Sequence, residues 1–145
     1  MPIEISSGGC YCGNISFEIE TSKSITEYQP RACDCDFCTK HGAAYLSDKS
    51  GHFKVRVRSE SDLGRYKQGS GIADFLVCKN CGVLIGVCYT EDGKMFGTIN
   101  ARALSHKSTL QKSVPASPKQ LLEIERIARW KEIWFSNVQI EIDNA

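Results

Sequence analysis

Cys33-Asp34-Cys35-Asp36-Phe37-Cys38 places three cysteines within six residues, in the spacing C-x-C-x-x-C, and Thr39-Lys40-His41-Gly42 follows directly. Residues two apart in an extended segment point the same way, and a two-residue gap suits a tight turn around one metal ion. Three protein ligands plus one open position is the arrangement in which zinc performs chemistry. The stretch therefore predicts a reactive zinc site with Cys33, Cys35 and Cys38 as ligands.

The sequence does not identify the fourth ligand of this site. His41 is the histidine next to the cluster, and it is interpreted either as that ligand or as a surface residue. A distant fourth ligand would equally make the site a closed, structural one. A redox role for the C-x-x-C spacing is disfavoured, because that motif usually lies beside a βαβ unit.

A second site is indicated by Cys78-Lys79-Asn80-Cys81-Gly82. Two cysteines flank a tight turn there, and the glycine after the second tolerates a positive φ. Cys10 and Cys12, spaced C-x-C before a strand, form the best-matched second pair. We therefore predict a structural zinc site from Cys10, Cys12, Cys78 and Cys81. The competing assignment joins the later pair to two of the central three cysteines, and Cys88 is interpreted as a plain buried thiol.

Composition limits the possible classes of protein. The chain has 145 residues, 41% of them hydrophobic and 24% charged, with a net charge of +1. This size favours a single domain over residues 1–145, and the charge balance argues against nucleic-acid or membrane partners. Met1 to Gly9 lacks the features of a signal peptide, so a cytoplasmic location is expected. In a reducing compartment clustered cysteines bind metal more often than they form disulfides, although a disulfide scaffold remains the alternative.

The pattern of apolar residues predicts a mainly β protein with one C-terminal helix. Alternation places Ile15, Phe17 and Ile19 on one buried strand face. Further strands are expected at 42–46, 53–58, 83–89, 95–99 and 138–142, with turns at 48–51 and 91–94. Ser117-Pro118 and the helical spacing from Leu121 to Trp134 predict a helix over about 118–135, whose apolar stripe packs on the sheet. Residues 7–14, 62–71 and 105–116 carry no clear strand signal.

Several of these segments together resemble a known family. Gly9-Cys10-Tyr11-Cys12-Gly13, the central Cys33/Cys35/Cys38 cluster with Gly42, the Cys78-x-x-Cys81-Gly82 turn and the stretch Ile99 to Leu104 are similar to the glutathione-dependent formaldehyde-activating enzymes, a family that includes centromere protein V. The resemblance covers about residues 5 to 105. The short chain is similar to the compact branch of the family.

The resemblance implies a β-tent fold, in which small antiparallel sheets are clamped by a four-cysteine zinc. It implies two zinc ions. The first is held by Cys10, Cys12, Cys78 and Cys81, and the second by Cys33, Cys35 and Cys38 with its open position toward the substrate. The family reaction joins glutathione and formaldehyde, which is a carbon–sulfur lyase reaction in reverse. A small-molecule thiol such as glutathione is the partner that follows.

Three functions fit these observations. The first is a zinc-dependent carbon–sulfur lyase acting on a thiol–aldehyde adduct. The second is a non-catalytic, zinc-stabilised module that binds a thiol or a protein, and the third is a zinc-buffering or redox-sensing protein. Glutathione carries two carboxylates, so its site should present cations. The candidates nearest the motifs in sequence are Lys40, His41, Arg65, Lys67 and Arg102. For each of them alone a solvated surface charge is the favoured interpretation, so none is assigned as a binding residue.

Overall fold

The computed structural model describes residues 3–68, 71–105 and 110–143. Most of the elements are strands: β1 Glu4–Gly9, β2 Ile15–Thr21, β3 Arg31–Cys33, β4 Tyr45–Leu46, β5 His52–Val57, β6 Leu63–Tyr66, β7 Asp74–Cys78, β8 Leu84–Glu91, β9 Lys94–Asn100, β10 Val114–Ala116 and β11 Asn137–Ile142. The α-helices are α1 Asp36–His41 and α2 Glu123–Ile133, and short 3₁₀ turns are η1 Ile25–Glu27, η2 Glu60–Asp62, η3 Ala101–Ala103 and η5 Pro118–Gln120. The prediction of a mainly β protein with one main helix near the C-terminus is confirmed.

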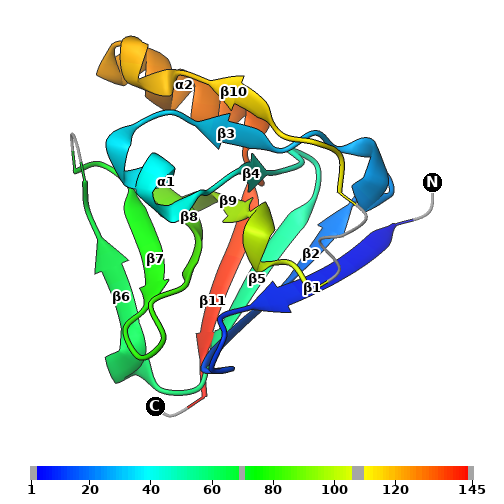
Figure 1. The fold of residues 1–145 in the computed structure, drawn as a ribbon, viewed down its shortest axis with the longest axis vertical. Coiled ribbons are helices and arrows are strands. Elements are labelled where there is room, and N and C mark those ends of the chain that lie inside the picture. The colour runs from blue at the N-terminus through cyan, green and yellow to red at the C-terminus, as the bar shows by residue number, and fades with distance from the viewer. Residues whose placement is uncertain (1–2, 69–70, 106–109, 144–145) are drawn as a thin grey trace.

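The strands form two sheets. One has four strands in the order β1-β2-β5-β11, and the other has seven in the order β10-β3-β4-β9-β8-β7-β6. Most neighbours are antiparallel, but β10 runs parallel to β3 and β11 runs parallel to β5. In Figure 1 the strands β1, β2 and β5 of the first sheet lie to the right, while β3 and β10 form the upper edge of the second sheet with α2 above them. The short β3, which ends in Cys33, is thereby held between β4, which follows it in the chain, and β10, which is distant in sequence.

The core is built from strands whose alternation is visible in the sequence. Ile15, Phe17 and Ile19 of β2 are buried, as predicted, and β5 buries every second residue in the same way. The two strands pair in antiparallel register, with Phe17 opposite Val55. Phe135 packs onto this cluster from the chain segment after α2. Full burial of each large apolar side chain contributes about 1.5–3 kcal/mol to folding.

Strand β1 was not expected from the sequence, because Ser6-Ser7-Gly8-Gly9 has a turn-like composition. It nevertheless pairs with β2 over its whole length, from Glu4 opposite Thr21 to Gly9 opposite Ser16. A Cβ on Gly8 would lie 2.3 Å from the carbonyl oxygen of Ala103. The glycine therefore permits close approach of η3 to the strand, and does not mark a turn. Tertiary pairing likewise makes strands of β6 and β10, within segments that have no strand pattern.

The C-terminal helix is shorter than predicted. Residues 118–120 form a 3₁₀ turn, Leu121 and Leu122 are extended, and α2 begins only at Glu123. The hydroxyl of Ser117 donates a hydrogen bond to Asp34 and caps no helix. The N–H of Leu122 instead donates to the Glu125 carboxylate at 2.8 Å, which starts α2 at this point. The predicted helix over 118–135 was therefore wrong in its first turn.

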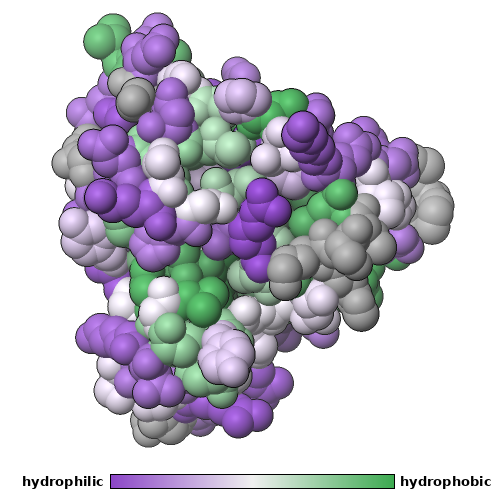
Figure 2. Space-filling view, viewed as in Figure 1, coloured by the Kyte–Doolittle hydropathy of each residue, from purple (hydrophilic) through white to green (hydrophobic). Residues whose placement is uncertain are grey.

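The apolar stripe assigned to α2 was also partly wrong. Ile124 is 75% exposed, whereas Trp134 just beyond the helix is 6% exposed. Figure 2 shows apolar surface at the upper left, where α2 begins. The helix is held by stacking of Trp130 on Trp134 and by an ion pair between Lys131 and Glu91 on β8. Among the described helices none is long and apolar enough to cross a lipid bilayer.

Asp48 fixes the turn that brings the two sheets together. Its carboxylate accepts hydrogen bonds from the N–H and hydroxyl of Ser22 at 2.8 Å, from Tyr28 at 2.6 Å and from Ser50. Burial alone would raise the pKa of Asp48, but these hydrogen bonds outweigh burial and hold the pKa well below its ordinary value. The bonds therefore stabilise the fold fully above about pH 4, and this contribution declines as the pH falls further.

We expect Asp48→Ala to lower the free energy of unfolding by about 2–4 kcal/mol, because several donors lose one charged acceptor. Urea denaturation at pH 7 measures this change. Glu132→Ala, which removes an exposed carboxylate from α2, is the control and should shift the free energy by less than about 0.5 kcal/mol. Equal effects of the two substitutions would contradict the role given to Asp48.

Candidate metal centres and the cavity beside one of them

Four cysteine sulfurs converge where the two sheets meet. Cys10 and Cys12 follow β1 of the four-stranded sheet, while Cys78 ends β7 of the other sheet and Cys81 lies in the turn behind it. Their Sγ atoms all lie within 4.8 Å of one another. The turn is shaped by Gly82, whose φ is +82° and whose N–H donates to the carbonyl of Cys78 at 2.7 Å. The four sulfurs could hold one metal ion.

The surroundings favour the thiolate form of Cys12 and Cys81, whereas burial raises the pKa of Cys78 to about 12. The N–H of Ile15 points at the Cys10 sulfur at 3.2 Å. A hydrogen bond from Asn80 lowers the pKa of Cys12. Burial opposes ionisation of Cys81, but the N–H groups of Cys12 and Val83 and the thiol of Cys78 lower its pKa to about 6. Donors aimed at sulfur prepare the cluster for a thiophilic cation such as zinc.

The three central cysteines also converge. Cys33 ends β3, Cys35 caps the N-terminus of α1 and Cys38 lies inside that helix, and their Sγ atoms lie within 4.8 Å of one another. The sequence predicted a turn here. The structure has a six-residue helix in its place, which ends at Gly42 with φ +63°. The Cys35 sulfur accepts the N–H of Cys38 at 3.4 Å, so one ligand candidate positions another.

Hydrogen bonds and burial shift the pKa values of Cys33 and Cys38 in opposite directions. A hydrogen bond from Cys38 lowers the pKa of Cys33 to about 6, while the same contact and burial raise the pKa of Cys38. Tyr45 Oη lies 3.0 Å from the Cys38 sulfur, and Gln68 Nε2 lies 3.9 Å from the Cys35 sulfur. Burial, followed by the charge of Cys38, raises the pKa of Tyr45, so its phenol keeps its proton.

The described part of the chain offers no fourth protein ligand at this cluster. Among these residues no histidine, carboxylate or further cysteine places a ligand atom within 4.8 Å of all three sulfurs. His41 is exposed, and its ring lies against Phe37 with centroids 4.6 Å apart. The structure therefore favours the surface interpretation of His41. Cys88 is buried far from water, which raises its pKa to about 12, in agreement with a plain buried thiol.

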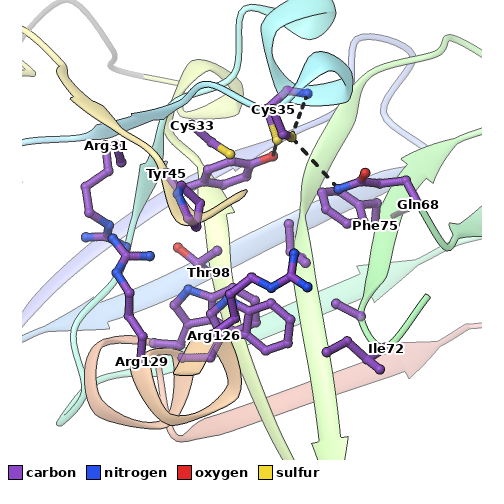
Figure 3. A pocket seen from close by; sticks show the side chains of 17 residues that line it. Arg31, Cys33, Cys35, Tyr45, Gln68, Ile72, Phe75, Thr98, Arg126 and Arg129 are labelled. Atoms are coloured by element: carbon purple, nitrogen blue, oxygen red, sulfur yellow. Dashed lines mark hydrogen bonds between the residues drawn. The ribbon is translucent and has the colours of Figure 1, made fainter. Parts of the chain in front are cut away.

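A cavity of about 210 Å³ lies directly beside the central cysteines (Figure 3). Their sulfurs form one wall, and α2 forms the opposite one. The side chains that line it come from β3, α1, β4, β7 to β10, α2 and the adjoining loops: Arg31, Cys33, Cys35, Cys38, Tyr45, Gln68, Ile72, Ala73, Phe75, Val87, Thr98, Ala116, Pro118, Arg126, Arg129, Trp130 and Trp134. A small molecule in this cavity would contact sulfur, aromatic rings and guanidinium groups together.

Nearness in sequence to the cysteine motifs did not identify the cations of this cavity. None of the five basic residues proposed on that ground lines it, and Lys67 instead pairs with Asp74 at 2.6 Å. The cavity cations are Arg31 on β3 and Arg126 and Arg129 on α2. The available signal was the helical spacing of Arg126, Arg129 and Trp130, which places two arginines on the face that also carries the tryptophan.

The mainly β fold and the two cysteine clusters define a class: small β proteins with two sites that could each hold a metal ion through thiolates. The family model of the glutathione-dependent formaldehyde-activating enzyme matches residues 5–117, and this chain belongs to that family. The chain is also similar to a solved structure of a Rhodobacter sphaeroides protein, at 24% identity, with a TM-score of 0.48, over 69% of this chain and 88% of that chain.

Proposed function

We propose that this protein is a zinc-dependent enzyme of the carbon–sulfur lyase type, which forms or cleaves an adduct between a glutathione-like thiol and an aldehyde such as formaldehyde. The observation that carries the proposal is the position of Cys33, Cys35 and Cys38 in the wall of the cavity. Three soft ligands without a fourth in the described chain leave a metal accessible to a small molecule there. Family membership supplies the thiol and the aldehyde as the candidate reactants.

Zinc fits both clusters. Cysteine thiolates are its usual ligands, four of them in structural sites and three protein ligands in catalytic ones. We assign the first role to Cys10, Cys12, Cys78 and Cys81, which would clamp the two sheets in the manner of a β-tent. We assign the second role to the three central cysteines. Thiolate sites of this kind persist in a reducing compartment, so we place the activity in the cytoplasm.

The reaction makes one bond and moves one proton. The thiol sulfur bonds to the aldehyde carbon, the carbonyl π electrons pass to oxygen, and the proton lost by sulfur ends on that oxygen to give a hydroxymethyl thioether. Zinc in the central site would supply a Lewis acid that favours the thiolate form of a thiol. Tyr45 holds Cys38 through its hydroxyl, and Gln68 approaches Cys35. The rings of Phe75, Trp130 and Trp134 exclude water from the space beside them.

Metal analysis gives the first test. Purified protein is expected to contain about two zinc ions per chain, because each cluster holds one. Elemental analysis by mass spectrometry, with protein quantified by amino-acid analysis, measures the ratio. A ratio near one or zero would refute the assignment of two sites.

Reaction kinetics give the second test. The protein is expected to speed the formation of S-hydroxymethylglutathione from glutathione and formaldehyde at least about tenfold over buffer containing the same zinc concentration, since both reactants are held together. Exchange NMR measures the rate at equilibrium. An unchanged exchange rate with fully zinc-loaded protein would remove this activity, and saturable thiol binding without acceleration would identify a binding module instead.

A further inference from the structure

Three arginines line the cavity beside the cysteines, and in Figure 3 the guanidinium groups of Arg31 and Arg129 lie together while that of Arg126 reaches another part of the cavity. Arg31 reaches the cavity from β3, and Arg126 and Arg129 reach it from α2. Arg31 and Arg129 carry like charges and lie close enough to repel each other. Like charges kept together in a partly buried space are unfavourable unless an anion joins them.

No carboxylate within the described residues neutralises these arginines. The four ion pairs found there all involve other cations. Arg31 donates from Nη2 to the Ser47 hydroxyl at 3.0 Å, which is a neutral acceptor. Arg126 Nε is inaccessible to water and has no hydrogen-bond partner. An unpaired buried donor on a charged group costs more than a neutral one, so the arrangement is poised to accept an anion.

The lining of the cavity thus combines groups of different chemistry. Besides the sulfurs and the arginines it includes Phe75, Val87 and the stacked pair Trp130–Trp134, whose ring centroids are 4.8 Å apart. A matching ligand has a thiol or an electrophilic carbon, an uncharged body and an anion. Guanidinium forks match a planar carboxylate through paired hydrogen bonds.

We infer that Arg126 and Arg129, with Arg31, form a carboxylate-binding subsite that makes this protein select anionic thiols over neutral ones. The inference rests on the proposed function for the role of the thiol, but the subsite itself is built by this chain. Helix α2, which contributes two of the three arginines, lies beyond residues 5–117 matched by the family model. Two of the three arginines of the subsite are therefore supplied by a segment outside the matched residues.

Ligand binding tests the subsite without turnover. The chain has two tryptophans, and both line the cavity, so intrinsic fluorescence reports binding at this place. Zinc-loaded protein is titrated with reduced glutathione and with glutathione diethyl ester, in which both carboxylates are masked, and formaldehyde is left out. The acid is expected to bind at least about tenfold more tightly than the ester, as the loss of charged hydrogen bonds requires.

Variants locate the effect. Arg126→Gln/Arg129→Gln is expected to bind glutathione at least about tenfold more weakly and to lose the preference over the ester. Arg58→Gln removes one positive charge from an exposed position on the surface and should change neither affinity by more than about twofold. Circular dichroism establishes that each variant is folded.

Equal affinity of wild type for acid and ester, or no saturable fluorescence change with the acid, would overturn the inference. Wild-type affinity of the folded Arg126→Gln/Arg129→Gln variant for glutathione would also overturn it. These outcomes are separate from those of the exchange measurement. If glutathione binding depends on the arginines but adduct exchange is not accelerated, the lyase proposal fails and the subsite stands. If adduct exchange is accelerated but glutathione and its diethyl ester bind equally well, the subsite fails and the lyase proposal stands.

Discussion

A Cys81→Ser variant is expected to be insoluble or unfolded under conditions in which the wild type is folded. Cys81 and Cys78 lie on the seven-stranded side of the structure, and Cys10 and Cys12 lie on the four-stranded side. A zinc ion held by all four would cross-link segments about 65 residues apart. Structural zinc contributes about 10 kcal/mol or more to folding, which is comparable to the whole stability of a domain of this size, about 5–15 kcal/mol.

Serine removes one thiolate while it changes the side-chain volume little, so the loss is one of coordination. Soluble yield, circular dichroism and zinc content measure the effect. Cys88→Ala is the matched control, because Cys88 is a buried cysteine outside both clusters, and it should cost only about 1–2 kcal/mol. A folded Cys81→Ser protein with about two zinc ions would contradict the structural role of this cluster.

Cys35→Ser is expected to remain folded, to hold about one zinc ion and to lose the acceleration of adduct exchange. The Cys35 sulfur caps α1 by accepting the N–H of Cys38, and a serine hydroxyl performs the same capping. The helix should therefore persist while the central site loses one of three ligands. The four-cysteine cluster shares no residue with it and should keep its own metal ion.

Zinc content, the melting temperature and the exchange rate separate the possible results. A melting temperature within a few degrees of the wild type, with exchange at the buffer rate, is the expected outcome. Global unfolding of Cys35→Ser would make the central cluster structural. A wild-type exchange rate in a variant with one zinc ion would remove this cluster from the reaction. Cys88→Ala again serves as the control, with both zinc ions and the full rate expected.

The grouping of the cysteines shows how far local spacing carries a prediction. A C-x-C or C-x-x-C segment places its own sulfurs on one side by backbone geometry alone, so each pair or triplet is readable from sequence. Which pairs meet across the chain is a matter of tertiary pairing. The structure brings Cys78 and Cys81 to Cys10 and Cys12 because β1 and β7 end at the same place, and it leaves the central three apart.

The cavity and its cations could not be predicted from local sequence patterns. Its cations come from β3 and α2, which are about 95 residues apart, and they meet because β10 pairs with β3 and leads the chain into α2. A helix whose sequence indicates an apolar stripe in fact presents Arg126 and Arg129 beside Trp130, with Ile124 left 75% exposed. Periodicity gives the faces of a helix, but docking contacts decide which face turns inward.

The sequence by itself determined the cysteine spacing, the alternation of β2 and β5 and the Asp92-Gly93 hairpin turn, because each of these depends on the stereochemistry of neighbouring residues. Tertiary contacts made the glycine-rich β1 a strand, left Cys33, Cys35 and Cys38 without a fourth ligand from the described residues, and placed three arginines along the cavity that these cysteines line. These features depend on contacts between distant segments, whose free energies outweigh local preference.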